Sequence, residues 1–286
     1  MKRSLSPRDL AAAIGVSESS LKRWADAGKI VYARTEGGHR RIPIAEAVRF
    51  IRATGAQLVR PDVIGLAEVA AVANDDGGDG ALYTHLAAGN LREARGVLMG
   101  RYLRGESVAS LCDGAVAHAM ARVGELWRHD ETGVFVEHRA TDCCLQAVAQ
   151  LRSMFDPPPG APVALGGAPT GDPYLLPSML AATVLAAEGV DAINLGPDTP
   201  VASLRHAIAH HRPRLVWLSL STPVAPGLAA SLGELAGQLA DAGGTLVLGG
   251  RHRAEAASEA RRACVVATMA ELAAFARGLV AGRAGG

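Results

Sequence analysis

From residue 161 onward, short apolar runs alternate with longer segments of helical periodicity. The apolar runs are PVALGG, AINLGP, LVWLSLS and TLVLGG, and the helical segments include SMLAATVLAAEG, VASLRHAIAHH, GLAASLGELAGQLADAGG and ELAAFARGLVAG. This alternation predicts a parallel sheet covered by helices. We therefore expect residues 161–286 to form a Rossmann- or flavodoxin-like α/β domain. In such domains ligands bind where strand ends and helix starts converge.

The stretch GDPYLLPSM, residues 171–179, lies where the first of these strands turns into the first helix. It contains Asp172, Tyr174 and two prolines, a set that matches no common catalytic chemistry. Its position at the carboxyl end of the sheet still marks it as a candidate ligand loop.

The middle of the chain is helical in pattern. Residues 81–156 contain the segments LYTHLAAGN, LREARGVLMGRYLRG, ESVASLCDGAVAHAMARVGELWRH and VFVEHRATDCCLQAVAQLRSMF. Short turns with Gly or Asn separate them, which predicts a four-helix bundle. Residues 59–80 are acidic and Gly-rich toward their end, and we expect them to form a linker.

The N-terminal stretch SPRDLAAAIGVSESSLKRWADAGKI has the pattern helix, turn, helix. Ser6 is placed to cap the first helix with Pro7 at its first position, and Gly15 ends it. Ser17 is placed to cap the second helix. A strand, a Gly-Gly turn, a second strand and a helix starting near Ile44 follow, so residues 1–58 are expected to form a winged helix-turn-helix domain.

Charge is divided unevenly along the chain. Residues 1–55 hold 11 Lys and Arg against 5 Asp and Glu, whereas the remainder holds 18 against 23. A basic module on an acidic body indicates that the N-terminus meets a polyanion. The side chains expected to face it come from the second helix and the hairpin tip: Ser19, Ser20, Lys22, Arg23, Arg34, His39, Arg40 and Arg41.

The run GVSESSLKRWADAGKI followed by RTEGGHRRI resembles the winged helix-turn-helix of the MerR family of regulators. The resemblance implies that the partner is an operator in double-stranded DNA. The long coiled coil that dimerises members of that family has no counterpart here. We therefore expect a homo-oligomer formed through the C-terminal body.

A second resemblance starts at Trp127, which is followed after nine residues by Glu137 and His138. This spacing, with LGPDTP, LSLSTP and VLGG further on, is similar to cobalamin-binding domains. The order of domains resembles that of CarH- and LitR-type repressors, which use adenosylcobalamin as a light sensor. The resemblance implies that cobalamin, if bound, lies under Trp127, Glu137 and His138, with the residues of the α/β domain beneath it. Those residues are Asp172, Tyr174, Ser219, Gly249 and Gly250.

The chain departs from this family at both axial positions of the cobalt. The family loop reads D-x-H-x-x-G, but here Tyr174 stands in place of the histidine and Pro177 in place of the glycine. A neutral phenol is a poorer ligand than imidazole. Arg128 follows Trp127 where the family has a second histidine, and His129 comes one place later. Three alternatives stay open: cobalamin bound without a loop ligand, another small molecule, or a purely structural body.

We thus expect a DNA-binding transcriptional regulator whose body controls oligomerisation and operator binding through a small ligand. It is not expected to be an enzyme, and no metal constellation is evident. The alternative is a cobalamin or tetrapyrrole carrier, or a methyltransferase-accessory protein, that does not regulate transcription. The four cysteines lack metal-type spacing and are expected to be buried thiols. The absence of a signal core or a long apolar stretch favours a cytoplasmic location.

Overall fold

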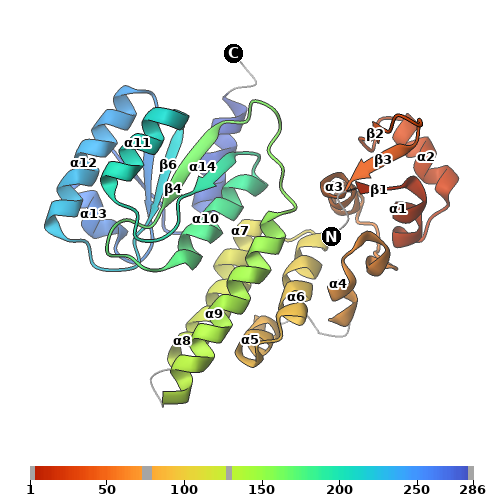
Figure 1. The fold of residues 1–286 in the computed structure, drawn as a ribbon, viewed down its shortest axis with the longest axis horizontal. Helices are drawn as coiled ribbons and strands as arrows, with labels where there is room; N and C mark the ends of the chain where they lie inside the picture. Colours follow the sequence, from red (N-terminus) through yellow and green to blue (C-terminus); the bar gives the residue numbers. More distant parts are fainter. Residues whose placement is uncertain (1–3, 73–78, 127–130, 283–286) are drawn as a thin grey trace. The chain divides into compact units, whose positions relative to one another are not determined.

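The computed structural model describes residues 4–72, 79–126 and 131–282 (Figure 1). The chain forms two compact units. The first comprises Met1–Ser107 and Gly114–Met154, and the second comprises Val108–Asp113 and Phe155–Gly286.

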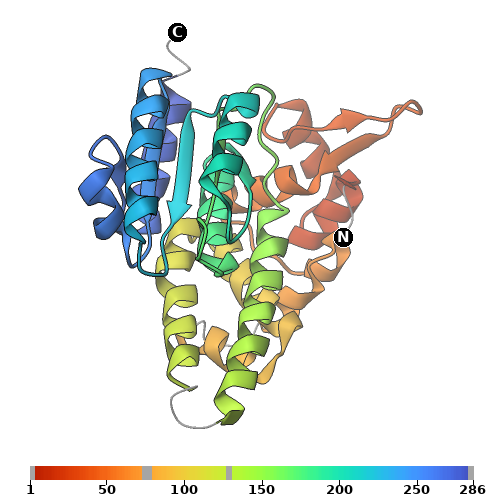
Figure 2. The same cartoon turned by 60° about the vertical axis from the view of Figure 1, so that its left-hand side comes forward.

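The head of the first unit is a winged helix-turn-helix. Its elements are β1 (Ser4–Leu5), α1 (Pro7–Ile14), α2 (Glu18–Asp26), β2 (Ala33–Arg34), β3 (Arg40–Pro43) and α3 (Ile44–Thr54). The strands form an antiparallel sheet in the order β1-β3-β2, and the β2–β3 hairpin extends away from the helices of the head (Figure 2). The predicted caps are present. The Ser6 hydroxyl accepts a hydrogen bond from the Asp9 N–H at 3.1 Å, and Gly15 ends α1 with φ 70°.

The helices of the head close on a small apolar core. Leu10, Leu21 and Ile42 are fully buried. Trp24 stacks on Phe50 with ring centroids 5.5 Å apart, so α2 and α3 are packed together as well as onto the sheet. This packing fixes the outer face of α2 relative to the hairpin.

The expected linker differs from what the structure shows. Residues 59–72 stay attached to the head and contain η1 (Pro61–Ile64) and α4 (Ala67–Ala71). The N–H of Val59 donates to the carbonyl of Ala13 at 2.8 Å, and Ile64 and Leu66 are fully buried. A few apolar side chains therefore hold this segment in place, although its composition toward the end is that of a linker.

The bundle in the first unit consists of α5 (Asp79–Ala88), α6 (Leu91–Leu103), α8 (Ala117–Leu126) and α9 (Glu131–Arg152). Its core is built from apolar positions on the facing sides of these helices, among them Leu82, Leu86, Val97, Leu98, Val123 and Ala147. The third predicted helix is interrupted, because a π-helical turn at Cys112–Val116 separates α8 from α7 (Val108–Leu111). The short α7 belongs to the second unit and packs on the helices of that unit.

The second unit is an α/β layer with a parallel sheet, as predicted, and the sheet has five strands. Its elements are β4 (Val163–Gly167), α10 (Leu175–Ala187), β5 (Asp191–Asn194), α11 (Val201–His211), β6 (Leu215–Ser219), α12 (Pro226–Asp241), β7 (Thr245–Gly249), α13 (Arg253–Glu259), β8 (Cys264–Val265) and α14 (Met269–Ala281). The strand order β5-β4-β6-β7-β8 is flavodoxin-like. Its switch point lies between β4 and β6. Sequence analysis missed α13 and β8, which are too short to give a periodic pattern.

Helices cover both faces of this sheet (Figure 1). Leu165, Val216 and Leu218 pack with α11, α12 and α13 on one face. Ala164, Leu215 and Trp217 pack with α10 and α14 on the other. Because successive strand residues point to opposite faces and both faces are buried, the strands appear in the sequence as continuous apolar runs.

The cysteines follow the prediction except at one position. Cys112, Cys143 and Cys144 are buried free thiols, whereas Cys264 is exposed. Cys264 lies in β8, a two-residue strand at the edge of the sheet, and therefore has a neighbouring strand on one side only. Among the described residues, no helix is long and apolar enough to cross a membrane. No cluster of three or more potential metal ligands occurs in that part of the chain either.

Candidate functional site

The first candidate surface is a groove in the head with a volume of about 360 Å³. It runs between the start of α1, the outer face of α2 and the hairpin. Its lining residues are Ser6, Pro7, Arg8, Glu18, Lys22, Arg34, Gly38, His39, Arg40 and Arg41. The fold thus gathers Lys22 of the second helix and the four predicted hairpin residues around one strongly basic hollow.

The predicted residues of α2 divide into two kinds. Ser19 and Ser20 both hydrogen-bond the Ser17 hydroxyl, at 2.9 and 3.0 Å, so they belong to the helix cap. Lys22 forms an exposed ion pair with Glu18 at 2.7 Å, and Arg23 is exposed on the same helix. Exposed pairs of this kind contribute little to stability. Both cations can therefore turn toward a phosphate at small cost.

The hairpin holds its cations in different ways. Arg34, His39 and Arg41 are exposed. Arg40 is ion-paired with Asp26 at the end of α2, and its side chain is only 17% exposed. Arg40 therefore ties the hairpin to α2, while its neighbours stay free to contact a ligand of the groove.

Sequence analysis missed Arg8 as a member of this surface. Arg8 is the second residue of α1, is exposed and lines the groove. The available signal was a basic residue directly after the capping Ser6 and Pro7.

The second candidate site lies at the switch point of the C-terminal sheet. Asp172 is buried, with 1% of its surface exposed. One of its carboxylate oxygens accepts a hydrogen bond from the Tyr174 N–H at 3.1 Å, and the other accepts from the Ser221 N–H at 2.5 Å. Asp198 in turn accepts from the Gly171 N–H at 2.8 Å. The loops after β4, β5 and β6 are therefore joined into one preformed rim.

This rim does not fit axial coordination of a corrinoid cobalt by a histidine. Tyr174 occupies the N-cap position of α10, and 54% of its surface is exposed. Both carboxylate oxygens of Asp172 already accept backbone hydrogen bonds, so this carboxylate holds the loop itself. The loop offers a phenol, not an imidazole, to any ligand above it.

A cavity of about 180 Å³ lies beside this rim, between α10, α14 and the ends of β6 and β7. It brings together the predicted Ser219, Gly249 and Gly250 with Pro177 and Trp217. Sites for drug-sized ligands usually measure about 300–1,000 Å³, so this cavity fits only a compact group.

Trp217 is the residue of this cavity that sequence analysis missed. It is 2% exposed, and its indole nitrogen has no hydrogen-bond partner in the described structure. A Cβ at Gly166 would lie 2.3 Å from the indole ring, so the ring rests directly on the backbone of β4. The one available signal was a large aromatic residue two places before Ser219 in LVWLSLS.

The two glycines of the cavity have different roles. Gly250 has φ 94°, and a Cβ there would lie 2.5 Å from the carbonyl oxygen of Leu220. Its identity is explained by backbone packing. At Gly249 the nearest atom to an added Cβ would be Cγ2 of Val266 at 3.5 Å, which is ordinary contact. Gly249 is therefore not required by packing.

The predicted residues over the corrin lie partly outside the described structure. Trp127, Arg128 and His129 fall in the residues that are not described. Glu137 and His138 lie on α9 of the first unit. The His138 side chain is 77% exposed, and its Nε2 lies 3.5 Å from Oε2 of Glu137. Glu137 also accepts a hydrogen bond from the Thr141 hydroxyl at 3.2 Å.

Two known protein families match the chain, one over the head and one over the bundle. Residues 4–54 match the family described as helix-turn-helix domain, and residues 81–152 match the family described as B12 binding domain. The chain is 26% identical over 244 residues to the HTH-type transcriptional repressor CarA of Myxococcus xanthus, covering 79% of this chain and 80% of that protein.

A solved structure adds to the comparison at the level of the fold. The monomethylamine corrinoid protein of Methanosarcina barkeri superimposes with a TM-score of 0.51 at 16% identity. The match covers 69% of this chain and 95% of that one. The shared feature is the architecture of helical and α/β layers.

Proposed function

We propose that this chain, a DNA-binding transcriptional regulator with a B12-binding-type domain, acts as an oligomer whose body sets how its heads meet an operator. The observation that carries the proposal is the basic groove of the head. Lys22, Arg34, His39 and Arg41 surround it from two separate elements. A helix that enters the major groove and a hairpin that reaches the backbone alongside would place these groups against phosphates.

Pairing of two heads on one site follows from the same proposal. An isolated head has a small interface, and two heads on half-sites one helical turn apart bind more tightly than one. The body, and not a coiled coil, would supply this pairing. The similar protein CarA of Myxococcus xanthus is a repressor, and repression by blocking the operator is the action proposed for this chain.

The experiment is a binding titration of the full chain with fluorescent duplexes selected from a random pool. Phosphate contacts release counterions, so affinity should fall linearly with the logarithm of salt concentration. Binding that ignores salt would contradict the proposed groove. A chain that binds no duplex at all would favour the carrier alternative.

The ligand of the C-terminal unit is proposed to be either a corrinoid, bound without a histidine from the loop, or a different molecule that is compact. The cavity beside Ser219 and Gly249 would hold an apolar group of that ligand against the indole of Trp217. Such a ligand shifts DNA binding only by its difference in affinity between the oligomeric states.

The protein can be purified with adenosylcobalamin or methylcobalamin, and its absorption spectra recorded in darkness and after illumination. These spectra distinguish a corrinoid ligand from a different one. Retained corrin absorbance supports the first, and colourless protein supports the second. Oligomeric state measured with and without the cobalamin tests whether the ligand controls assembly. An oligomeric state that is the same with and without the cobalamin, in darkness and after illumination, would contradict ligand control by a corrinoid.

A further inference from the structure

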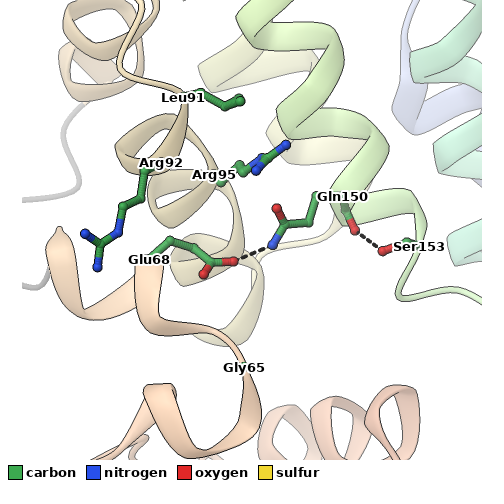
Figure 3. Close-up of a pocket in the computed structure, with 7 residues that line it drawn as sticks. All are labelled: Gly65, Glu68, Leu91, Arg92, Arg95, Gln150 and Ser153. Atoms are coloured by element: carbon green, nitrogen blue, oxygen red, sulfur yellow. Dashed lines mark hydrogen bonds between the residues drawn. The ribbon is translucent and has the colours of Figure 1, made fainter. Parts of the chain in front are cut away.

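A second large cavity lies in the first unit, at the junction of α4, α6 and the C-terminal end of α9 (Figure 3). Its volume is about 590 Å³, and it is lined by polar side chains with one apolar member, Leu91. Gln150 of this cavity lies 13 residues beyond Glu137 on α9, which is about 20 Å along the helix axis. The cavity is therefore separate from the residues predicted to cover a corrin.

Two arginines from α6 line this cavity. Arg92 and Arg95 are three residues apart, so they lie on the same side of the helix. Neither arginine side chain forms an ion pair or a hydrogen bond with another described residue. The Nε of Arg95 is buried without an acceptor. By contrast, Arg101 on the same helix is ion-paired with Glu106 at 2.6 Å. A buried cationic donor without an acceptor is costly, and among the described residues the Nε atoms of Arg95 and Arg139 are both in this position.

One acidic side chain lines the same cavity, but it does not neutralise the arginines. The Glu68 carboxylate accepts a hydrogen bond from the amide of Gln150 and thus points toward α9 (Figure 3). The Ser153 hydroxyl donates to the carbonyl of Gln150 at 2.6 Å, a local contact at the C-terminal end of α9. With two guanidinium groups and one carboxylate, the lining carries an excess of one positive charge.

We propose that this cavity binds a small organic anion through a phosphate or carboxylate group. The oxyanion is held by the Arg95 guanidinium, whose fork of N–H donors matches two oxygens of such a group. The exposed Arg92 lines the same cavity and adds positive charge to it. The volume leaves room for the remainder of a small metabolite.

Binding at this site would act directly on α4, in the segment that follows the DNA-binding head. Glu68 lies on α4, and α4 packs so closely on α6 that a Cβ at Gly96 would lie 2.2 Å from the Glu68 carbonyl oxygen. An anion on Arg95 would bring like charge near the Glu68 carboxylate. Binding therefore opposes the present position of α4, and the anion acts as an effector independent of the C-terminal ligand.

The test is a titration of the full chain with inorganic phosphate and, separately, citrate, at constant ionic strength. Proton–nitrogen correlation spectra of the arginine Nε–Hε groups identify the arginine that responds. The Arg95 signal should move and saturate with at least one probe. Saturation with phosphate only would mean that the ligand carries a phosphate group. Saturation with citrate only would mean that it carries carboxylates.

Variants give the direction of each contribution. Arg95→Gln should weaken binding about tenfold or more, since a charge-assisted hydrogen bond is lost. Glu68→Gln should strengthen it about threefold or more, because a like charge is removed. Arg104→Gln is the matched control, as Arg104 immediately follows the same helix, carries the same charge and does not line the cavity.

Two outcomes would overturn the proposal. The first is an Arg95 signal that fails to saturate with either probe. The second is equal weakening by Arg95→Gln and Arg104→Gln, which would mean that the anions only screen surface charge. If Arg95→Gln does not fold, Glu68→Gln decides, because unchanged or weaker binding in that variant would also contradict the site.

Discussion

The carboxylate of Asp172 accepts a hydrogen bond of 2.5 Å from the backbone N–H of Ser221. This contact joins the loop after β4 to the loop after β6, the two strands that flank the switch point of the sheet. The other carboxylate oxygen accepts from the Tyr174 N–H. Asp172 therefore holds the loops of the ligand rim together. This role explains why an acidic residue is buried here although the loop has no histidine ligand.

Replacing Asp172 with Ala should destabilise the chain by about 2–4 kcal/mol, because two backbone N–H groups lose their acceptors. Asp172→Asn keeps one acceptor and should cost less. Urea denaturation followed by circular dichroism measures the free energy of unfolding. Asp191→Ala, at an exposed position in β5, is the control and should change it by less than about 0.5 kcal/mol. Equal effects of the Asp172 and Asp191 variants would contradict the role given to the rim.

Adding a methyl group should destabilise the chain much more at Gly250 than at Gly249, at the end of β7. Gly250→Ala meets backbone at 2.5 Å with φ 94° and should lower the free energy of unfolding by about 2 kcal/mol or more. Gly249→Ala meets only ordinary contacts and should cost less than about 1 kcal/mol. Since Gly249 lines the cavity, its variant should instead weaken ligand retention. A stability loss at Gly249 as large as at Gly250 would show that both glycines serve packing alone.

The fold could be predicted from the sequence because its signals are periodic. Apolar strands such as LVWLSLS, helix caps at Ser6 and Ser17, and the turn at Gly15 are local patterns with a direct physical cause. The start of α3 at Ile44 followed from the same reasoning. Short elements such as α13 and β8 gave no such pattern.

The sites were predictable only in part, because a site depends on which groups remain unpaired after folding. Arg40 looked like its neighbours in the sequence, but Asp26 holds it. Arg95 looked like any helix-surface cation, and only the packing of α4 and α9 leaves it beside a cavity without an acceptor. Pairing of this kind depends on contacts between residues far apart in the sequence.

Removing an unpaired cationic side chain from the head should weaken binding to all DNA sequences by a similar factor. Arg41→Gln and Arg8→Gln should each weaken binding to selected and unrelated duplexes by similar factors and reduce the salt slope by about 1. Fluorescence anisotropy over a salt series measures both quantities. Arg205→Gln, whose arginine pairs with Glu234 in the second unit at 2.9 Å, is the charge-matched control. Equal slopes for all these variants would exclude Arg8 and Arg41 from phosphate contact.

Exposed cysteines should react with alkylating reagents faster than buried ones. Burial raises the pKa of the Cys144 thiol to about 12, so it stays protonated and unreactive when the pH is raised from about 7 to about 9. Exposed Cys264 should react first with iodoacetamide. Mass spectrometry of the labelled peptides gives the order, and Cys264→Ser should abolish the fast phase. Fast labelling of Cys144 in the folded chain would contradict the packing of α9.

Restoring the loop should strengthen corrinoid retention if the loop is what limits it. Tyr174→His supplies an imidazole at the N-cap of α10, where the present side chain is 54% exposed. Pro177→Gly removes a ring that lines the cavity beside Trp217. The double variant should retain more cobalamin through gel filtration than the parent chain, as judged by absorbance. Tyr174→Phe is the matched control, because it removes the hydroxyl without adding a nitrogen ligand. If the double variant retains no more than Tyr174→Phe, the size of the cavity around Trp217, and not the missing imidazole, decides which ligand the domain accepts.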